Sequence, residues 1–318
     1  FLVFPDSKLV VSYFHYWWDN VFSMPPYAWK KESGMEQAHS TRAPWKFFLL
    51  TYAFSWTIWF PSVLDGLGLT LPFDAAGYSM VVVVIGAFAP LLAALTLIGR
   101  QRGWQGIKSF FRRAIDFQIQ PVYWVTAFLL PLAIHLIGHY LALALGLEVA
   151  RTLFPEEIAV SPILLAIPYF FLMLLIGGGQ EEFGWRGYAQ EPLQTKYGPI
   201  PASLGIGLVW GVWHLPLWFM AGDLHSAYSF LAFVIMTMSI SLIYTWLYNA
   251  SGKKLLAVIV FHAMNNTAAP LLPFLHAIEG KPETAYWVYA GVNLFFGVLF
   301  AVLLVKRSQS IKEENLVS

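Results

Sequence analysis

The sequence predicts an all-α, polytopic membrane protein that folds as a bundle of eight transmembrane helices. Of its 318 residues, 58% are hydrophobic and only 12% are charged, against roughly 25% charged residues in soluble domains. Aromatic residues make up 17% of the chain and include 14 Trp, a residue type that membrane proteins concentrate near lipid headgroups. This composition excludes an ordinary soluble enzyme.

Eight apolar segments reach or exceed the roughly 20 residues that a membrane-spanning helix needs. Glycines, prolines and charged residues separate them, as expected of connecting loops. In order, the segments are 45–64, 78–98, 122–146, 161–190, 199–220, 228–248, 255–275 and 285–305. Residues 35–318 are expected to form one eight-helix domain. Residues 1–34 are expected to be a leader or added segment before a native start at Met35, or an amphipathic arm on the membrane surface.

The charged residues predict how the eight helices are oriented. From Lys30 onward, sixteen Lys and Arg residues lie before or at the start of the first segment, after the last, or in and beside every second loop, whereas only Arg151 and Lys281 lie in the alternate loops. Because cytoplasmic loops are enriched in Lys and Arg, both termini are predicted to be cytoplasmic in a multi-pass protein of the cell membrane. The sixteen are Lys30, Lys31, Arg42, Lys46, Arg100, Arg102, Lys108, Arg112, Arg113, Arg186, Lys196, Lys253, Lys254, Lys306, Arg307 and Lys312.

Charge balance and the absence of cysteine exclude several functions. Nineteen basic residues against 18 acidic ones leave no excess charge to neutralise phosphates, so nucleic acid is not an expected partner. The sequence contains no Cys, which excludes disulfides, thiolate metal sites and a cysteine nucleophile. Membrane lipids are the expected surroundings, and the sequence does not specify an oligomeric state.

Three polar clusters lie within the apolar segments. Ionisable side chains are costly inside a bilayer, so they are functional candidates by default. The clusters are Glu181, Glu182 and Arg186 in the fourth segment, Trp210 and His214 in the fifth, and His262 and Asn266 in the seventh.

The spacing of two clusters predicts that they meet. If the fourth segment stays helical to about Gln194, it forms an antiparallel hairpin with the fifth, with a turn at Tyr197-Gly198-Pro199. Glu181 and His214 then lie nearly equidistant from this turn, both about 20 Å along their helices. They would face each other where the rotation of the helices permits.

Two further pairs are spaced four residues apart, which places each pair on one face of a helix. His262 and Asn266 form the first pair. Glu182 and Arg186 form the second, and they are expected to make a structural ion pair that leaves Glu181 free for chemistry.

These residue types suit hydrolysis by an activated water. A buried carboxylate can act as a general base, and a neighbouring His can share the proton and pass it to a leaving amine. A second His with an Asn offers hydrogen-bond donors to a tetrahedral oxyanion. The residues therefore indicate a peptidase centre without a covalent nucleophile.

The three motifs resemble those of the CAAX prenyl protease and bacteriocin-processing (CPBP, or Abi) family of intramembrane endopeptidases. The family motifs are Glu-Glu-x-x-x-Arg, Phe-x-x-x-His and His-x-x-x-Asn, and they occur here in that order within about 165–275. Trp210 stands where the family has Phe, a change that is expected to keep the aromatic packing. Eight helices also fit the family's architecture.

The resemblance implies a glutamic endopeptidase that acts on a membrane-associated peptide or lipidated protein near the cytoplasmic half of the bilayer. Eukaryotic members trim prenylated CAAX proteins. By this resemblance, Glu181 and His214 would activate the water. His262 and Asn266 would form the oxyanion site, and Glu182 and Arg186 would organise the site.

Other functions stay open at this point. Glu181, His214 and His262 could hold a catalytic zinc, but a glutamate and two histidines suffice for water activation, so no metal or other cofactor is expected. A proton-coupled transporter would use the same groups as a relay, although a relay has no need of Asn266. A noncatalytic scaffold or immunity protein would tolerate Glu181→Gln.

The remaining candidates have structural interpretations. His135 and His139, four residues apart, are expected to be satisfied interhelical histidines rather than metal ligands, and His225 and His276 are expected at the outer interface. The basic stretch 100–113 is expected to be a loop that lies on anionic lipid, with recruitment of a negatively charged substrate as the alternative.

Overall fold

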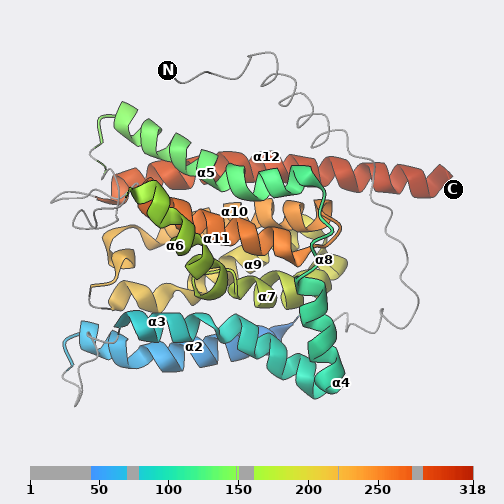
Figure 1. Cartoon of the computed structure of the whole chain (residues 1–318), viewed down its shortest axis with the longest axis horizontal. Helices are drawn as coiled ribbons and strands as arrows, with labels where there is room; N and C mark the ends of the chain where they lie inside the picture. Colours follow the sequence, from blue (N-terminus) through green and yellow to red (C-terminus); the bar gives the residue numbers. More distant parts are fainter. Residues whose placement is uncertain are drawn as a thin grey trace.

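The computed structural model describes residues 44–69, 79–147, 149, 161–220, 222–273 and 282–317. Residues 1–34 and His276 lie outside these ranges. The described residues form helices and turns without a strand (Figure 1). The helices are α2 (Trp45–Gly66), α3 (Ser79–Ala87), α4 (Ala89–Ala114), α5 (Pro121–Ala144), α6 (Pro162–Ile176), α7 (Glu181–Gly184), η1 (Trp185–Ala189), α8 (Gln190–Tyr197), α9 (Pro199–Trp213), η2 (Leu215–Phe219), η3 (Leu224–Ala227), α10 (Phe230–Ala250), α11 (Leu255–Leu271) and α12 (Pro282–Val317).

The helices have the length and surface of membrane-spanning segments. Within the described ranges, seven helical stretches are long and apolar enough to cross a membrane, and an eighth apolar helix, α11, has 17 residues. Large apolar side chains cover the outside of the bundle; Ile163 is 74% exposed and Phe295 is 67% exposed. Such side chains are suited to lipid rather than water. The predicted all-α, polytopic fold is confirmed.

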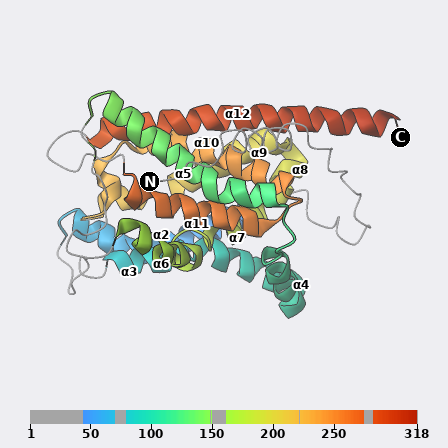
Figure 2. The same cartoon turned by 45° about the horizontal axis from the view of Figure 1, so that its top comes forward.

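α10 lies at the centre of the bundle. It packs against α9 and α12, and most of its residues are buried. α11 packs against α5 and α6, and α2 packs against α3 and α4. Figures 1 and 2 show α5 and α12 on one side of the molecule and α2 with α3 on the other, so α7, α9, α10 and α11 bring their side chains together in the interior.

The fourth predicted segment is interrupted just before its glutamates. Between α6 and α7, residues Gly177–Gln180 form bends and turns. Gly178 has a φ of 131°, which favours glycine, and a Cβ at Gly179 would lie 2.3 Å from the carbonyl oxygen of Leu174. The prediction of one continuous helix is therefore wrong here, because the glycines allow a tight backbone turn that side chains would block.

The predicted hairpin between the fourth and fifth segments is confirmed. α7 continues through one π-helical turn, η1, into α8, and π turns of this kind often occur at functional sites. Gly198 then turns the chain with a φ of 84°, and α8 packs against α9.

The basic stretch 100–113 is helical, which corrects the prediction of a loop. The second predicted segment divides into α3 and α4, and α4 continues to Ala114. Inside it, Gly103 has non-helical angles (φ 61°, ψ −161°), so the helix changes direction there. Beyond this residue α4 turns away from the long axis of the bundle (Figures 1 and 2).

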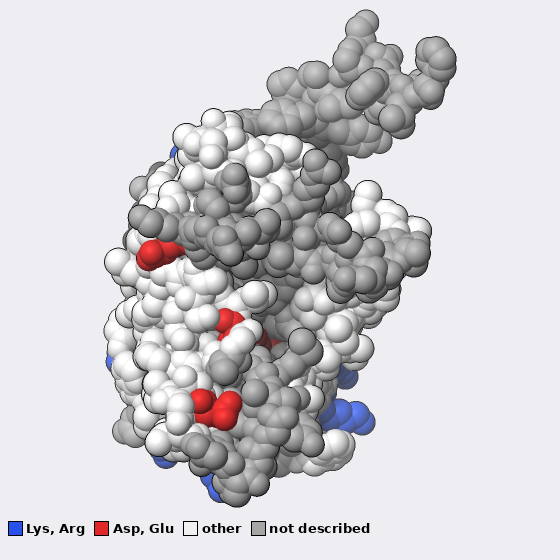
Figure 3. All heavy atoms as spheres, turned by 90° about the vertical axis from the view of Figure 1, so that its left-hand side faces the viewer, with Lys and Arg blue, Asp and Glu red and all other residues white. Residues whose placement is uncertain are grey.

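The described Lys and Arg residues gather at one end of the bundle, where Glu191 and Asp116 pair with two of them, and other acidic residues lie at the opposite end. Lys196, at the end of α8, and Lys253, in the α10–α11 turn, share one end. Asp65, Asp223 and Glu283 lie at the other end, beside the end of α2, the end of α9 and the start of α12. Figure 3 looks onto the left end of Figure 1 and shows Asp and Glu on its face, with Lys and Arg only at the margins.

Candidate active site

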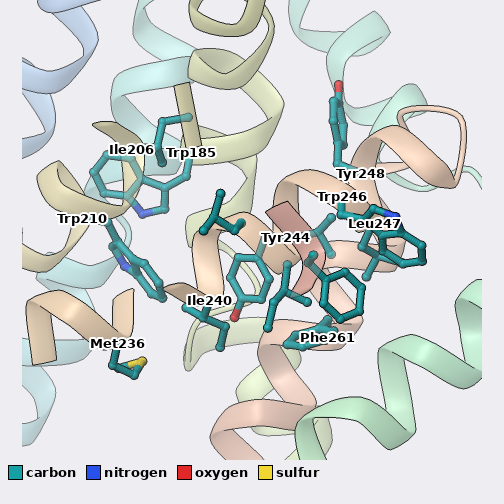
Figure 4. Close-up of a cluster of buried hydrophobic side chains, with 14 of the residues drawn as sticks. Trp185, Ile206, Trp210, Met236, Ile240, Tyr244, Trp246, Leu247, Tyr248 and Phe261 are labelled. Atoms are coloured by element: carbon teal, nitrogen blue, oxygen red, sulfur yellow. The ribbon is translucent and has the colours of Figure 1, made fainter. Parts of the chain in front are cut away.

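Glu181 begins α7, and its side chain is held by two indole groups. The residue is 6% exposed. Its Oε2 accepts hydrogen bonds from Nε1 of Trp210 at 2.9 Å and from Nε1 of Trp185 at 3.4 Å. Trp185 and Trp210 lie in one buried cluster with Tyr244 (Figure 4). Uncharged donors therefore orient this carboxylate without neutralising it.

Glu182 is fully buried and has two partners. Its Oε1 accepts hydrogen bonds from Nη1 of Arg186 at 3.0 Å and from Nδ1 of His262 at 2.8 Å. Arg186 also donates to the hydroxyl of Ser241 and lies 4.5 Å from the centre of the Tyr244 ring. The predicted Glu182–Arg186 pair is confirmed as a contact. The bond to His262 was missed, because 80 residues separate the two in the sequence.

His262 and Asn266 meet the glycine turn that precedes α7. A Cβ added at Gly178 would lie 2.6 Å from Nε2 of His262 and 2.7 Å from Nδ2 of Asn266. The Asn266 amide donates a hydrogen bond to the carbonyl oxygen of Gly177. Both side chains therefore project from α11 toward the same turn, as their spacing predicts, and only a glycine fits between them.

His214 directly follows α9 and reaches the site through Trp210. Its Nδ1 lies 2.9 Å from the Trp210 carbonyl oxygen, so Nδ1 carries the proton and Nε2 keeps its lone pair. The Trp210 ring lies 5.8 Å from the His214 ring and 5.3 Å from the His262 ring, between centroids. Trp210 thus touches Glu181, His214 and His262. Trp210 packs against aromatic rings here and, unlike a Phe, carries the N–H that bonds to Glu181.

Asp223 and His225 lie beside His214, a relationship that sequence reasoning missed. His225 was expected at the outer interface, and its ring also stacks on the His214 ring with centroids 6.0 Å apart. Oδ1 of Asp223 accepts hydrogen bonds from Nδ1 of His225 at 2.7 Å and from its backbone N–H at 2.9 Å. The sequence Asp-x-His directly after the fifth segment could have indicated this pair.

The hydrogen bonds of this pair control the charge of Asp223. Burial raises the pKa of the Asp223 carboxyl, but the hydrogen bonds from the ring and amide of His225, together with charge interactions with His225 and His214, lower it by more, so the pKa lies below its usual value. Asp223 is therefore ionised at neutral pH and fixes the orientation of the His225 ring.

A ladder of polar pairs joins the helix that carries Glu181 to α10. Arg186 bonds to Ser241 at 2.9 Å, Gln190 to Thr245 at 3.4 Å, and Gln194 to Asn249 at 3.2 Å. Each pair is separated by 55 residues, and each step along either helix is four residues. α8 and α10 are therefore parallel, and their polar side chains meet on one stripe.

The histidines of α5 have protein partners, in agreement with their predicted interhelical role. Nδ1 of His135 lies 3.0 Å from the carbonyl oxygen of Pro131 in its own helix, and its Nε2 lies 3.5 Å from the hydroxyl of Tyr289 in α12. Nδ1 of His139 lies 2.9 Å from the carbonyl oxygen of Pro273, beyond the end of α11. The part of the chain that the structure describes contains no group of three His, Asp or Glu side chains arranged to hold a metal ion. Whether catalysis depends on a metal stays a prediction.

Comparisons with known proteins agree with the motifs. A sequence model of the family described as "Type II CAAX prenyl endopeptidase Rce1-like" matches residues 163–268, a range that includes all three motifs. The protein named CAAX prenyl protease 2 from Methanococcus maripaludis is 28% identical over 236 residues, which cover 72% of this chain and 84% of that protein. These matches confirm the predicted resemblance, and they indicate that the chain is an intramembrane protease similar to the Rce1-like CAAX prenyl endopeptidases.

Proposed function

We propose that this chain is a metal-free glutamic endopeptidase that cleaves a membrane-associated protein or peptide. The name of the relative from M. maripaludis, CAAX prenyl protease 2, favours a prenylated CAAX-type protein as the substrate. The observation that carries the proposal is that one side chain, Trp210, contacts Glu181, His214 and His262. The three groups that the reaction needs are therefore neighbours within an apolar interior.

Glu181 and His214 activate the water in this proposal. As the water oxygen attacks the scissile carbonyl carbon, its proton passes to this pair of bases. Nε2 of His214 is suited to accept it, because the Trp210 carbonyl already holds the proton on Nδ1. When the C–N bond breaks, the proton goes to the departing nitrogen, so the products are a carboxylic acid and an amine.

His262 and Asn266 stabilise the oxyanion that forms on the carbonyl oxygen. The Asn266 amide has two hydrogens, of which one bonds to Gly177. Nδ1 of His262 donates its hydrogen to the Glu182 carboxylate 2.8 Å away. When Nε2 also carries a hydrogen and donates it to the oxyanion, the ring is positively charged, and the Glu182 carboxylate balances that charge. Prearranged donors of this kind are often the largest single contribution to catalysis.

The protein is proposed to lie in the cell membrane with both termini in the cytoplasm. The gathering of the described Lys and Arg residues at one end of the bundle supports this orientation. Since the chain has no Cys, single cysteines at exposed Thr195 and Ser226, at opposite ends, can be labelled alone. In intact cells, an impermeant maleimide should modify the cysteine at 226 and leave the one at 195 unmodified.

Replacement of Glu181 tests the catalytic proposal. Glu181→Gln keeps the shape of the side chain but removes the base, so the cleavage rate should fall by roughly 10²- to 10⁴-fold. Glu191→Gln is the matched control, because Glu191 is a partly exposed carboxylate on the same helical stretch, paired with Lys253. Membranes that contain each variant should be compared for new protein N-termini and for cleavage of a prenylated peptide and its unprenylated counterpart. Full activity of Glu181→Gln would overturn the proposal.

A further inference from the structure

The part of α4 beyond its bend is an amphipathic helix that crosses the bundle. We call residues Trp104–Ala114 the basic arm. The non-helical backbone at Gly103 turns the basic arm away from the long axis of the molecule. Figures 1 and 2 show it across that axis at one end of the bundle. A helix in this position, at the end of helices long enough to span a membrane, is placed to lie along the membrane surface.

The two faces of the basic arm differ in charge and burial. Phe110 and Ala114 face inward and are at most 3% exposed. Lys108, Arg112 and Arg113 are exposed, and Trp104 is 73% exposed. A basic outer face with an exposed aromatic residue is typical of helices that lie in the headgroup region.

The arm carries cations without acidic neighbours on its own helix. α4 contains no Asp or Glu, and the first carboxylate after it, Asp116, forms an ion pair with Lys254. The exposed side chains that continue the surface, Ile115 at 59% and Phe117 at 72%, are apolar. Positive charge interleaved with apolar groups complements an anionic lipid, whose headgroup and acyl chains provide both kinds of contact.

The inner face of the arm packs against the segment that carries the two glutamates. The Phe183 ring, directly after Glu182, lies 6.0 Å from the Phe110 ring and 5.5 Å from the Phe111 ring, between centroids. A Cβ at Gly187, in the π turn, would lie 3.1 Å from the Phe110 ring. The arm therefore supports α7 and η1 directly.

A second connection reaches the helix that carries His262. Asp116 follows the arm, and its partner Lys254 immediately precedes α11. The hydrogen bond from Lys254 lowers the pKa of the Asp116 carboxyl, so this carboxyl is ionised at neutral pH. A displacement of the arm would thus act on both sides of the candidate active site.

We propose that the basic arm binds anionic lipid headgroups, and that this binding holds α7 and η1 in the arrangement that supports catalysis. The protease is then more active in an anionic bilayer than in a neutral one. The statement about activity rests on the function proposed above, whereas lipid binding by the arm does not.

The activity of purified protein in lipid nanodiscs tests the second part. Wild type should cleave its substrate faster with phosphatidylglycerol in the disc than with phosphatidylcholine alone. The triple variant Lys108→Gln, Arg112→Gln, Arg113→Gln should lose this stimulation and keep the rate seen in the neutral disc. The control triple Lys46→Gln, Lys196→Gln, Lys306→Gln removes three exposed cations from the same end and should keep the stimulation.

A label on the arm tests lipid binding without any measurement of catalysis. Gln105 is exposed and the chain has no Cys, so Gln105→Cys can carry a single environment-sensitive fluorophore. Its emission should shift as the phosphatidylglycerol fraction rises, and inorganic phosphate should not replace the lipid. Each arm cation removed should weaken lipid binding roughly 5-fold, the equivalent of about 1 kcal/mol per basic residue.

Three results would overturn the proposal. The label could be insensitive to phosphatidylglycerol, the arm triple could keep the stimulation, or both triples could lose it equally. If the arm triple instead slows cleavage only of acidic substrates in neutral discs, the arm recruits substrate and the lipid proposal is wrong. Activity of Glu181→Gln in either disc would contradict the proposed function but leave the label result standing.

Discussion

The indole N–H of Trp210 donates a 2.9 Å hydrogen bond to Oε2 of Glu181. The phenylalanine found at this place in the family motif has no such donor. The position therefore offers a direct way to separate ring packing from hydrogen bonding at the candidate base.

Trp210→Phe should lower kcat with little change in folding. A hydrogen bond to a charged group contributes roughly 1.5–3 kcal/mol, so we expect a loss of about 10- to 100-fold. Trp59→Phe is the control, because Trp59 is also buried but its N–H bonds to backbone carbonyls of α3 and not to a glutamate. Melting temperatures in detergent should be measured beside kcat and KM. An unchanged kcat would mean that the N–H does not contribute to catalysis.

Glu182→Gln should lower both stability and activity. Removing one partner of a buried ion pair typically costs about 3–5 kcal/mol, because the other charge is left unpaired. Arg186→Met in the same chain should recover part of the melting temperature. It should not recover activity, because Glu182 also bonds to His262. Recovery of both by the double variant would mean that the bond to His262 has no catalytic role.

Gly178→Ala should abolish cleavage. The added Cβ would lie within 2.7 Å of atoms of both His262 and Asn266, and the backbone there has a φ of 131°. Gly205→Ala is the control, since a Cβ at that helical glycine meets nothing within 4 Å. Single-turnover cleavage and melting temperature should be recorded together. A fully active Gly178→Ala would show that the two side chains can move apart without consequence.

The Asp223–His225 pair should make a pH-dependent contribution to stability. Because the pKa of Asp223 is lowered in the folded chain, the pair stabilises the fold above the ordinary Asp pKa of about 3.9. That contribution is lost as the pH falls through the lower folded value. Melting temperatures of wild type and Asp223→Asn should therefore differ at neutral pH and converge in acid. Asp65→Asn, at the same end of the bundle, controls for general charge effects; a gap that widens in acid would contradict the prediction.

Chelators should leave cleavage intact if the reaction is metal-free. Purified protein should contain much less than one zinc per chain, and EDTA or phenanthroline should not change the rate. Elemental analysis and activity before and after chelation check this. Loss of activity that zinc alone restores would establish a metalloenzyme, with Glu181, His214 and His262 as the first candidates for ligands.

The spacing of motifs predicted much of the site because helical periodicity fixes which residues share a face. The hairpin at Gly198 and the common face of His262 and Asn266 follow from counting residues. The bond between Glu182 and His262 could not be predicted in this way, because it depends on how two distant helices rotate about their axes. The bend at Gly103 was also missed, because a hydropathy pattern indicates which segments are apolar but not where the backbone changes direction.

Three hydrogen-bonded pairs fix the axial register of two parallel helices. The pairs are Arg186 with Ser241, Gln190 with Thr245 and Gln194 with Asn249. A slip by one step would shift the helices by about 6 Å and leave a polar group without its partner in an apolar interior. The position of Glu181 along the bundle is therefore set by its register against α10 and not by the thickness of the lipid bilayer. A thinner or thicker bilayer should change how the whole bundle sits, while the bond that is cut stays at the same place relative to the protein.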